Sequence, residues 1–398
     1  MDTLLHRIKE LAAQAYPEVV AIRRDLHAHP ELSFDEHRTA AKVCEYLDKW
    51  GIPYQKGVAK TGVLALLEGR NPNKKIIALR ADMDALPIQE TNEIDYKSVN
   101  EGIMHACGHD VHTASVLGTA YILSQLKDSF EGTVKFIFQP SEEKLPGGAS
   151  VMIAEGVLEN PKPSAIYGQH VYPDLPAGKV GFRPGMYMAS CDEIYVTVKG
   201  KGGHGALPHC NIDPVLISAH MIVALQQIVS RHADPRIPTV LSFGKVIANG
   251  ATNIIPNEVY LEGTFRTLNE EWRNRAHQLM VQQAEGIAQS MGGSVDFRIE
   301  KGYPFLTNDL VLTGRAMAAA KAFLGNENVI DLDVRMTAED FSWYTQKLPA
   351  CFYRLGTASH DGKFNSSVHT PTFNIDENAL QTGMGLMAWL AVDELGNA

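Results

Sequence analysis

The chain has 398 residues, of which 45% are hydrophobic and 21% charged, an ordinary globular composition with enough apolar material for a sizeable core. This length favours two domains, or one large domain with an insertion. The formal net charge of -10 disfavours nucleic acid as a partner, because an acidic surface repels phosphate backbones.

The first part of the chain alternates helical and strand patterns. Helices that alternate with short apolar strands favour an α/β fold whose sheet is buried on both faces. The predicted helices are residues 4–29, 36–50 and 112–126, and the predicted strands are residues 62–68, 75–80, 133–139 and 165–169.

Near residue 180 the pattern changes to half-exposed strands and longer helices. The predicted order is β-α-β-β-α-β, the split βαβ arrangement of a ferredoxin-like domain with two helices on one sheet face. We therefore expect a separate domain at residues 182–296, inserted between two parts of the first domain, residues 1–181 and 297–398. The predicted strands of the insertion are residues 193–199, 239–247, 258–266 and 294–300, and its helices are residues 213–230 and 270–291.

The alternation of helices and strands returns after residue 303 and completes the first domain. Its predicted elements are helices at residues 310–324, 340–346 and 378–395 and a strand at residues 351–355.

The sequence also indicates a cellular compartment. It has no apolar stretch long enough to span a bilayer, and its first ten residues lack the apolar core of a secretory signal. The five cysteines are odd in number and widely spaced, which argues against a disulfide framework and fits a reducing compartment. We therefore expect a cytoplasmic protein.

The densest cluster of metal-binding side chains is the segment His105-Ala-Cys-Gly-His-Asp-Val-His112. Thiolate and imidazole groups bind zinc and similar divalent ions. Cys107 and His109 are two positions apart, so in an extended chain their side chains point the same way. Asp110 or another carboxylate is expected to orient His109 by accepting its second N–H. The density of ligands favours a metal site over a polar loop with a buried cysteine.

Two adjacent glutamates follow a predicted strand in the segment Phe138-Gln-Pro-Ser-Glu-Glu-Lys144. Adjacent side chains diverge, so both rarely bind one ion. A division of labour is natural, in which one glutamate binds metal and the other accepts a proton from the attacking water. On its own, the pair also fits an ordinary acidic surface.

Four further polar residues follow predicted strands or precede the last helix. Asp82 and Asp84 follow one strand, His170 follows another, and His369 lies just before the last helix. Singly, the aspartates fit a capped turn and the histidines fit structural roles. The residues that fall at or just beyond predicted strands or at loop-to-helix junctions are Cys107, Glu142, Glu143, His170 and Asp84. Because ligands bind at the carboxyl ends of strands in open α/β sheets, several of these strand ends are expected to converge on one cleft.

The chain carries the motifs RADMDALP, HACGHDVHT, FQPSEE, QHV and VHTP. As a set they resemble those of the M20 metallopeptidases, and most closely the amidohydrolase subgroup of hippurate hydrolases, N-acyl-amino-acid deacylases and auxin-conjugate hydrolases. The resemblance extends from RRDLHAHPELSF at residues 23–34 to VHTP at residues 368–371. It implies a catalytic α/β domain interrupted by a ferredoxin-like lid domain that often dimerises.

The resemblance also implies a role for each site residue. Glu142 would be the general base and acid, and Asp84 the acid that supports a metal ligand. Asp82 stands where related enzymes have a ligating His, and so falls outside the ligand set. The site would hold one or two divalent ions, and zinc, manganese, cobalt and nickel all fit mixed ligands of this kind. The implied metal ligands are Cys107, His109, Glu143, His170 and His369.

The predicted insertion contributes a second set of residues through the resemblance. The segment KGGHGALPH at residues 201–209 matches the family stretch GGHxAxPH and implies that His204 reaches the scissile carbonyl, in its own subunit or across a dimer interface. Asn253 and Arg266 match positions that hold the substrate carboxylate or the tetrahedral oxygen. Without the resemblance, the glycines of this segment fit a turn and Arg266 fits an exposed strand.

These residues predict a metal-dependent amidohydrolase that cleaves N-acyl amino acids into a carboxylic acid and a free amino acid. A dipeptidase or carboxypeptidase is the alternative on the same site. A binding protein with a structural metal is disfavoured by Glu142 and Glu143, since a structural site needs no spare base, and a reactive thiol at Cys107 is a further hypothesis. We expect a small-molecule substrate, a homodimer formed through the lid, and no nucleic-acid or membrane partner.

Overall fold

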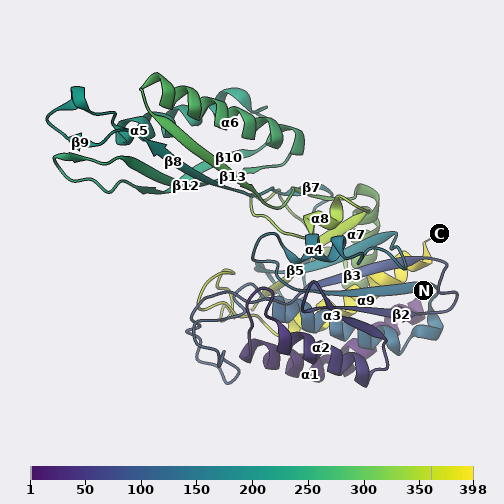
Figure 1. Cartoon of the computed structure of the whole chain (residues 1–398). Helices are drawn as coiled ribbons and strands as arrows, with labels where there is room; N and C mark the ends of the chain where they lie inside the picture. Colours follow the sequence, from purple (N-terminus) through teal and green to yellow (C-terminus); the bar gives the residue numbers. More distant parts are fainter. Residues whose placement is uncertain (1, 360, 398) are drawn as a thin grey trace. The chain divides into compact units, whose positions relative to one another are not determined.

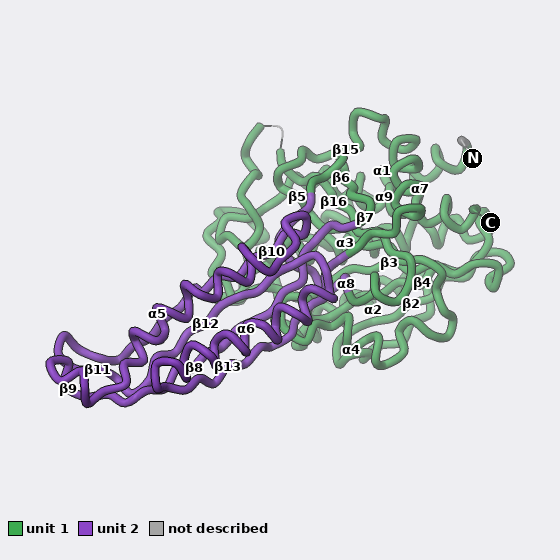
Figure 2. Tube along the Cα trace, turned by 90° about the horizontal axis from the view of Figure 1, so that it is seen from above, with its two compact units in different colours: residues 1–185, 307–333, 343–398 green, residues 186–306, 334–342 purple. Residues whose placement is uncertain are grey.

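The computed structural model of the protein describes residues 2–359 and 361–397. The chain divides into two units, which Figure 2 shows in different colours. Unit 1 comprises residues 1–185, 307–333 and 343–398, and unit 2 comprises residues 186–306 and 334–342. The predicted insertion, residues 182–296, includes most of the first segment of unit 2 but not its second segment, residues 334–342.

Unit 1 is built on a mixed eight-stranded sheet in the order β1-β2-β4-β3-β5-β16-β6-β15. Its centre is parallel, because β4, β3, β5 and β16 pair in the same direction. All seven residues of β4 are buried, as the apolar run TVKFIFQ requires of a strand covered on both faces. The α/β class is confirmed. The strands are β1 (Tyr54–Val58), β2 (Gly62–Glu68), β3 (Ile76–Asp82), β4 (Thr133–Gln139), β5 (Ala165–Pro176), β6 (Val180–Phe182), β15 (Val329–Asp331) and β16 (Ala350–Ala358).

The buried helix α3 (His109–Ser124) carries part of the predicted site into the centre of unit 1. It packs against the sheet and contacts both α1 and α9, as Figure 1 shows. Because its sequence is apolar on nearly every side, it can be buried all round. Among the described residues no helix combines the length and apolarity that crossing a bilayer demands. The other helices are α1 (Asp2–Ala28), α2 (His37–Lys49), α4 (Gly148–Ala154), α7 (Leu310–Leu324), α8 (Ser342–Thr345) and α9 (Asn378–Gly396).

Unit 2 contains a four-stranded antiparallel sheet in the order β10-β12-β8-β13. Along the chain its elements run β8-α5-β10-β12-α6-β13, the order predicted from the sequence. Both helices begin at a side-chain cap, since Asp213 accepts the N–H of Val215 and Asn269 accepts that of Trp272. The elements are β8 (Asp192–Lys199), β9 (Gly203–His204), α5 (Pro214–Leu225), β10 (Thr239–Ile247), β11 (Ile254–Ile255), β12 (Glu258–Thr267), α6 (Glu270–Ser290) and β13 (Ser294–Lys301), with β7 (Gly185–Met188) and β14 (Leu306–Asn308) at the boundary with unit 1.

Candidate metal centre

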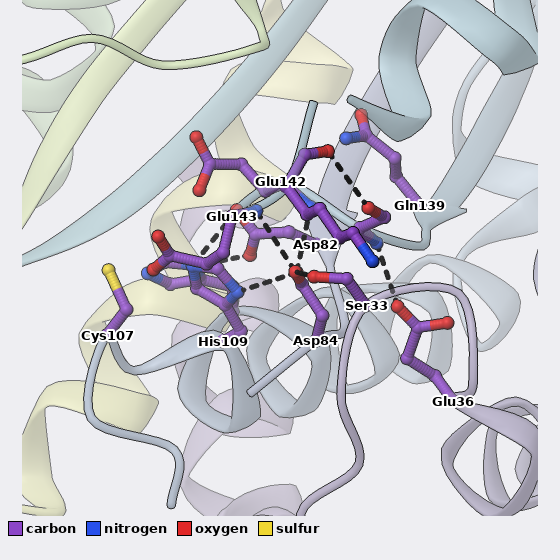
Figure 3. Close-up of polar contacts among 12 residues, drawn as sticks. Ser33, Glu36, Asp82, Asp84, Cys107, His109, Gln139, Glu142 and Glu143 are labelled. Carbon is purple, nitrogen blue, oxygen red and sulfur yellow. Dashed lines mark hydrogen bonds and ion pairs between the residues drawn. The ribbon is translucent and has the colours of Figure 1, made fainter. Parts of the chain in front are cut away.

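The predicted metal ligands lie together in unit 1, near neighbouring strands of the parallel part of the sheet. Glu143 follows β4, Cys107 precedes α3, and His109 is the first residue of α3. Figure 3 shows the side chains of these three residues. His170 lies inside β5 rather than after it, because that strand runs on to Pro176. His369 comes from the loop that precedes α9.

The sulfur of Cys107 is the common point of this cluster. It lies 3.4 Å from Nε2 of His170 and 3.3 Å from Nε2 of His369. The same His369 nitrogen lies 3.2 Å from Oε1 of Glu143. Two groups of potential ligand atoms, Cys107–His109–His170 and Cys107–Glu143–His369, therefore share the sulfur, with the atoms of each group within 4.8 Å of one another. Such an arrangement of five residues could hold one or two divalent ions.

The two buried histidines of the first group are oriented as metal ligands usually are. Nδ1 of His109 donates to Oδ1 of Asp84 at 3.1 Å, while its buried Nε2 has no hydrogen-bond partner among the described residues. Nδ1 of His170 donates to the carbonyl of Val171 at 2.8 Å, which leaves Nε2 facing Cys107. A buried polar nitrogen is normally paired, and a ligating imidazole usually donates its second N–H. With sulfur and carboxylate beside them, these residues fit a divalent metal.

Gly108 determines how Cys107 and His109 enter the site. Its φ of 82° lies in the left-handed region, and an added Cβ would lie 2.7 Å from Cγ2 of Val171. The chain therefore turns at Gly108, and α3 begins at His109, three residues earlier than predicted. The segment is thus not extended, as the sequence argument assumed, but Cys107 and His109 still direct their side chains to one group of ligand atoms.

Asp82 and His112 form a third potential ligand group with His109, but their own atoms are already paired. Asp82 accepts from Nδ1 of His112 and from Nη1 of Arg80, both at 2.6 Å. Nε2 of His112 accepts the backbone N–H of Val171 at 2.9 Å. We therefore leave Asp82 and His112 outside the ligand set.

Asp84 joins the two halves of the site. Besides holding His109, it accepts the backbone N–H of Glu142 on Oδ1 at 2.9 Å and that of Glu143 on Oδ2 at 3.0 Å. The hydroxyl of Ser33 donates to Oδ2 at 2.6 Å (Figure 3). Asp84, and not Asp110, is therefore the carboxylate that orients His109. Ser33 lies in the motif RRDLHAHPELSF, but its hydrogen bond to Asp84 was not predicted from the sequence.

Asp110 belongs to a different buried network. It accepts from Nε of Arg23 and from Nδ1 of His27, both at 2.8 Å. Arg23 also donates to Oδ1 of Asn374 at 3.0 Å. This network ties the residue after His109 to α1 and to the chain before α9.

Burial and neighbouring charges oppose each other in their effects on the pKa values of Asp84 and His109, and they act together on that of Cys107. Burial raises the pKa of Asp84, but the hydrogen bond and charge of His109 lower it below its usual value. Burial lowers the pKa of His109, but the Asp82 charge and the Asp84 hydrogen bond raise it to about 10. Burial and the charge of Glu143 raise the pKa of the Cys107 thiol well above its usual value. Cys107 is 6% exposed, so a reagent has little access to its sulfur.

The predicted substrate-binding residues of unit 2 lie at two separate places. His204 on β9 pairs with β11, and the carbonyl of Asn253 accepts the N–H of Gly205 at 2.8 Å, so these residues are neighbours at the end of unit 2 marked β9 and β11 in Figure 2. Arg266 lies near the far end of β12 and donates to the carbonyl of Met336 at 3.3 Å. Because the ten residues of β12 span about 30 Å, one copy of unit 2 does not bring Arg266 to His204.

Comparisons with known proteins agree with this geometry. Residues 78–393 match the model of Peptidase family M20/M25/M40. An N-acyl-L-amino acid amidohydrolase of Geobacillus stearothermophilus is 46% identical over 296 residues, which cover 74% of this chain and 79% of that protein. Thermostable carboxypeptidase 2 of Saccharolobus solfataricus is 36% identical, with 98% of each chain covered. A solved Bacillus subtilis protein described as a dinuclear metal-binding peptidase has a TM-score of 0.83 at 37% identity, with 97% of this chain and 100% of that chain covered. The chain belongs to the M20 peptidase family, as its motifs indicated.

Proposed function

We propose that the protein hydrolyses the amide bond of N-acyl amino acids and releases a carboxylic acid and a free amino acid. The observation that carries this proposal is the position of Glu142, whose carboxylate lies within 4.8 Å of ligand atoms of His109 and Glu143. A ligand cluster with a second carboxylate beside it suits hydrolysis, whereas a structural metal site needs no extra base.

The ligands in this proposal are Cys107, His109, Glu143, His170 and His369. When bound, a divalent ion would polarise the acyl carbonyl and lower the pKa of the attacking water. Zinc, manganese, cobalt and nickel all fit a donor set of one thiolate, three imidazoles and a carboxylate. The free state of all five cysteines supports a reducing, cytoplasmic location.

Glu142 moves the proton in this reaction. Its side chain accepts a proton from the attacking water and later passes it to the nitrogen of the leaving amine. Only 7% of the residue is exposed, so bulk water has little access to this carboxylate. Asp84 does not touch the substrate in this scheme and instead holds the backbone of Glu142 and the ring of His109.

His204, Asn253 and Arg266 would bind the substrate from unit 2. Arg266 suits a substrate carboxylate, because guanidinium and carboxylate pair through two hydrogen bonds. His204 would donate to the oxygen that becomes negative in the transition state. Arg266 lies near the C-terminal end of β12, whereas His204 lies on β9, which pairs with β11 just before β12 begins. We therefore propose that a homodimer supplies them to one site from two subunits.

Exposed apolar side chains on unit 2 support a dimer. Strand β10 is the edge of its sheet, and Val246 at its end is 53% exposed. On α5, Leu216 is 50% and Val223 is 75% exposed. An apolar sheet edge is prone to pair with another chain. We expect Val223→Glu to yield a monomer in light scattering, with metal content unchanged and activity reduced. A variant that stays dimeric, or a monomer with full activity, would contradict this part of the proposal.

The principal test of the function is the substitution Glu142→Ala. The variant should bind metal normally and lose about 10²–10⁴-fold in turnover, the usual contribution of a general base. His170→Ala and His369→Ala should instead lose metal, as measured by elemental analysis of the purified protein. Turnover of Glu142→Ala near the wild-type value, or full metal occupancy in both histidine variants, would refute these roles.

A dipeptidase or carboxypeptidase activity is the second candidate, because the chain is similar to a thermostable carboxypeptidase over 98% of its length. Hippurate, acetyl-amino acids and dipeptides assayed side by side, with each of the four metals added in turn, would separate the two. Faster hydrolysis of dipeptides than of every N-acyl amino acid would favour this second candidate.

A further inference from the structure

The turn that carries Glu142 and Glu143 is held by two buried carboxylates. The backbone N–H of Ser141 donates to Oε1 of Glu36 at 2.8 Å. The next two N–H groups, of Glu142 and Glu143, donate to the two oxygens of Asp84 at 2.9 and 3.0 Å. Three successive backbone groups are therefore anchored, two by Asp84 and one by Glu36 (Figure 3).

Ser141 has a backbone conformation that needs such an anchor. Its φ of 52° lies in the left-handed region, which a residue with a side chain rarely adopts. The residue is fully buried, and its carbonyl accepts the N–H of Gly148 at 2.7 Å. Strained conformations persist where the surrounding structure enforces them. If Ser141 relaxed, the direction of the two glutamates that follow it would change.

Glu36 supplies this anchor from outside the ligand cluster. It immediately precedes α2 and is fully buried. Oε1 also accepts the N–H of Phe34 at 2.9 Å, and Oε2 accepts the hydroxyl of Thr61 at 2.5 Å. All of these donors are neutral, so the carboxylate acts here as a set of hydrogen-bond acceptors. Burying a carboxylate is costly unless such bonds satisfy it.

We propose that Glu36 is a positioning residue of the hydrolytic site, which sets the directions of Glu142 and Glu143 by holding Ser141 in its left-handed conformation. The proposal rests on the proposed function in assigning Glu142 to proton transfer. The hydrogen bonds on which it depends are independent of that function. Glu36 lies two residues after the motif RRDLHAHPELSF, which contributes no metal ligand.

A pair of variants separates geometry from charge. Glu36→Gln keeps the length of the side chain, because its carbonyl can accept from Ser141 and Phe34 while its amide donates to the Thr61 hydroxyl. Glu36→Asp keeps the charge but is one carbon–carbon bond shorter and cannot span to Ser141. We expect Glu36→Gln to keep turnover close to wild type. Glu36→Asp should lose about 10–100-fold in kcat and in metal affinity, with little change in KM.

Hydrogen exchange provides a readout that does not need activity. In Glu36→Asp, the amides of residues 141–143 should exchange faster than in the wild type, whereas Glu36→Gln should protect them. Metal affinity is measured by competition with a chelator. If the wild type hydrolyses no N-acyl amino acid, the proposed function fails, but exchange and metal affinity still test the role of Glu36.

Glu394→Asp is the matched control. Glu394 is 2% exposed and binds Lys75 and Arg315 in unit 1, so this variant shortens an equally buried carboxylate that has no contact with the ligand cluster. It should keep the wild-type kcat and the protection of residues 141–143. A loss in this control equal to that of Glu36→Asp would overturn the proposal.

Two other results would overturn it. The first is a Glu36→Asp variant with the kcat and the hydrogen exchange of the wild type. The second is a loss of kcat in Glu36→Gln equal to that in Glu36→Asp, which would assign the effect to the charge of Glu36. If Glu36→Asp does not fold, Thr61→Val removes a single hydrogen bond from Glu36. That variant should speed exchange at residues 141–143 to a smaller extent, and unchanged exchange would count against the proposal.

Discussion

Replacing Asp84 by asparagine would test how the two halves of the site are joined. The carboxylate receives four hydrogen bonds, from His109 and the backbone of Glu142 on one oxygen and from Ser33 and the backbone of Glu143 on the other. Asparagine has the same shape, but one of its two terminal groups is a donor. Whichever way the amide is turned, its NH₂ group faces a backbone N–H that then has no acceptor.

The expected size of the effect follows from these contacts. Leaving one buried N–H unpaired costs about 1–3 kcal/mol, and a hydrogen bond to a charged group is worth about 1.5–3 kcal/mol. Asp84→Asn should therefore lower the free energy of unfolding by about 3–5 kcal/mol. Ser33→Ala removes one donor, leaves the carboxylate three others, and should cost only about 0.5–1.5 kcal/mol.

Urea unfolding of both metal-loaded variants measures the stabilities, and steady-state kinetics measures turnover. Misplacing catalytic groups by about 1 Å can lower the rate about 10²-fold, so Asp84→Asn should lose about that much in kcat. An unfolding free energy within about 1 kcal/mol of wild type, together with wild-type turnover, would refute the role we give to Asp84.

Two further predictions concern a glycine and an ion pair. Gly108 has a left-handed conformation, and Gly108→Ala would place a Cβ 2.7 Å from Val171. The variant should therefore destabilise the protein by about 2–4 kcal/mol and weaken metal binding. Adding Val171→Ala should recover part of the stability measured by urea unfolding. In unit 2, burial raises the pKa of Asp192, but the hydrogen bonds from His277 and Arg273 bring it below its usual value. Its contribution to stability is thus present above the unfolded pKa of about 4 and is lost as the pH falls through the folded pKa. The stability gap between wild type and Asp192→Asn should shrink with acidification in urea titrations at several pH values, and a gap that stays constant would contradict this.

Long periodic elements were the most predictable part of the fold. The bounds of β2, β4, β10 and α7 agree with those expected from the sequence, because each is a continuous run with one periodicity. Short strands such as β1, β6 and β15 were missed, and so was the seven-residue helix α4. The three to five residues of such a strand carry little periodicity, and whether they form a strand depends on a partner elsewhere in the chain. The start of α3 was misplaced because a left-handed glycine, rather than a change of pattern, begins it.

The sequence by itself determined the order of the elements, the α/β class, the family, and which residue types are available to hold a metal. Periodicity and side-chain chemistry are local properties, so they can be recognised without coordinates. The tertiary structure decided how those residues are paired: it placed Asp84 rather than Asp110 on His109 and made the Cys107 sulfur common to two ligand groups. These pairings depend on β3, β4 and β5 lying side by side, although their segments are separated by other elements in the sequence. A polar side chain finds its partner on another element of the fold, and sequence spacing does not reveal which one it is.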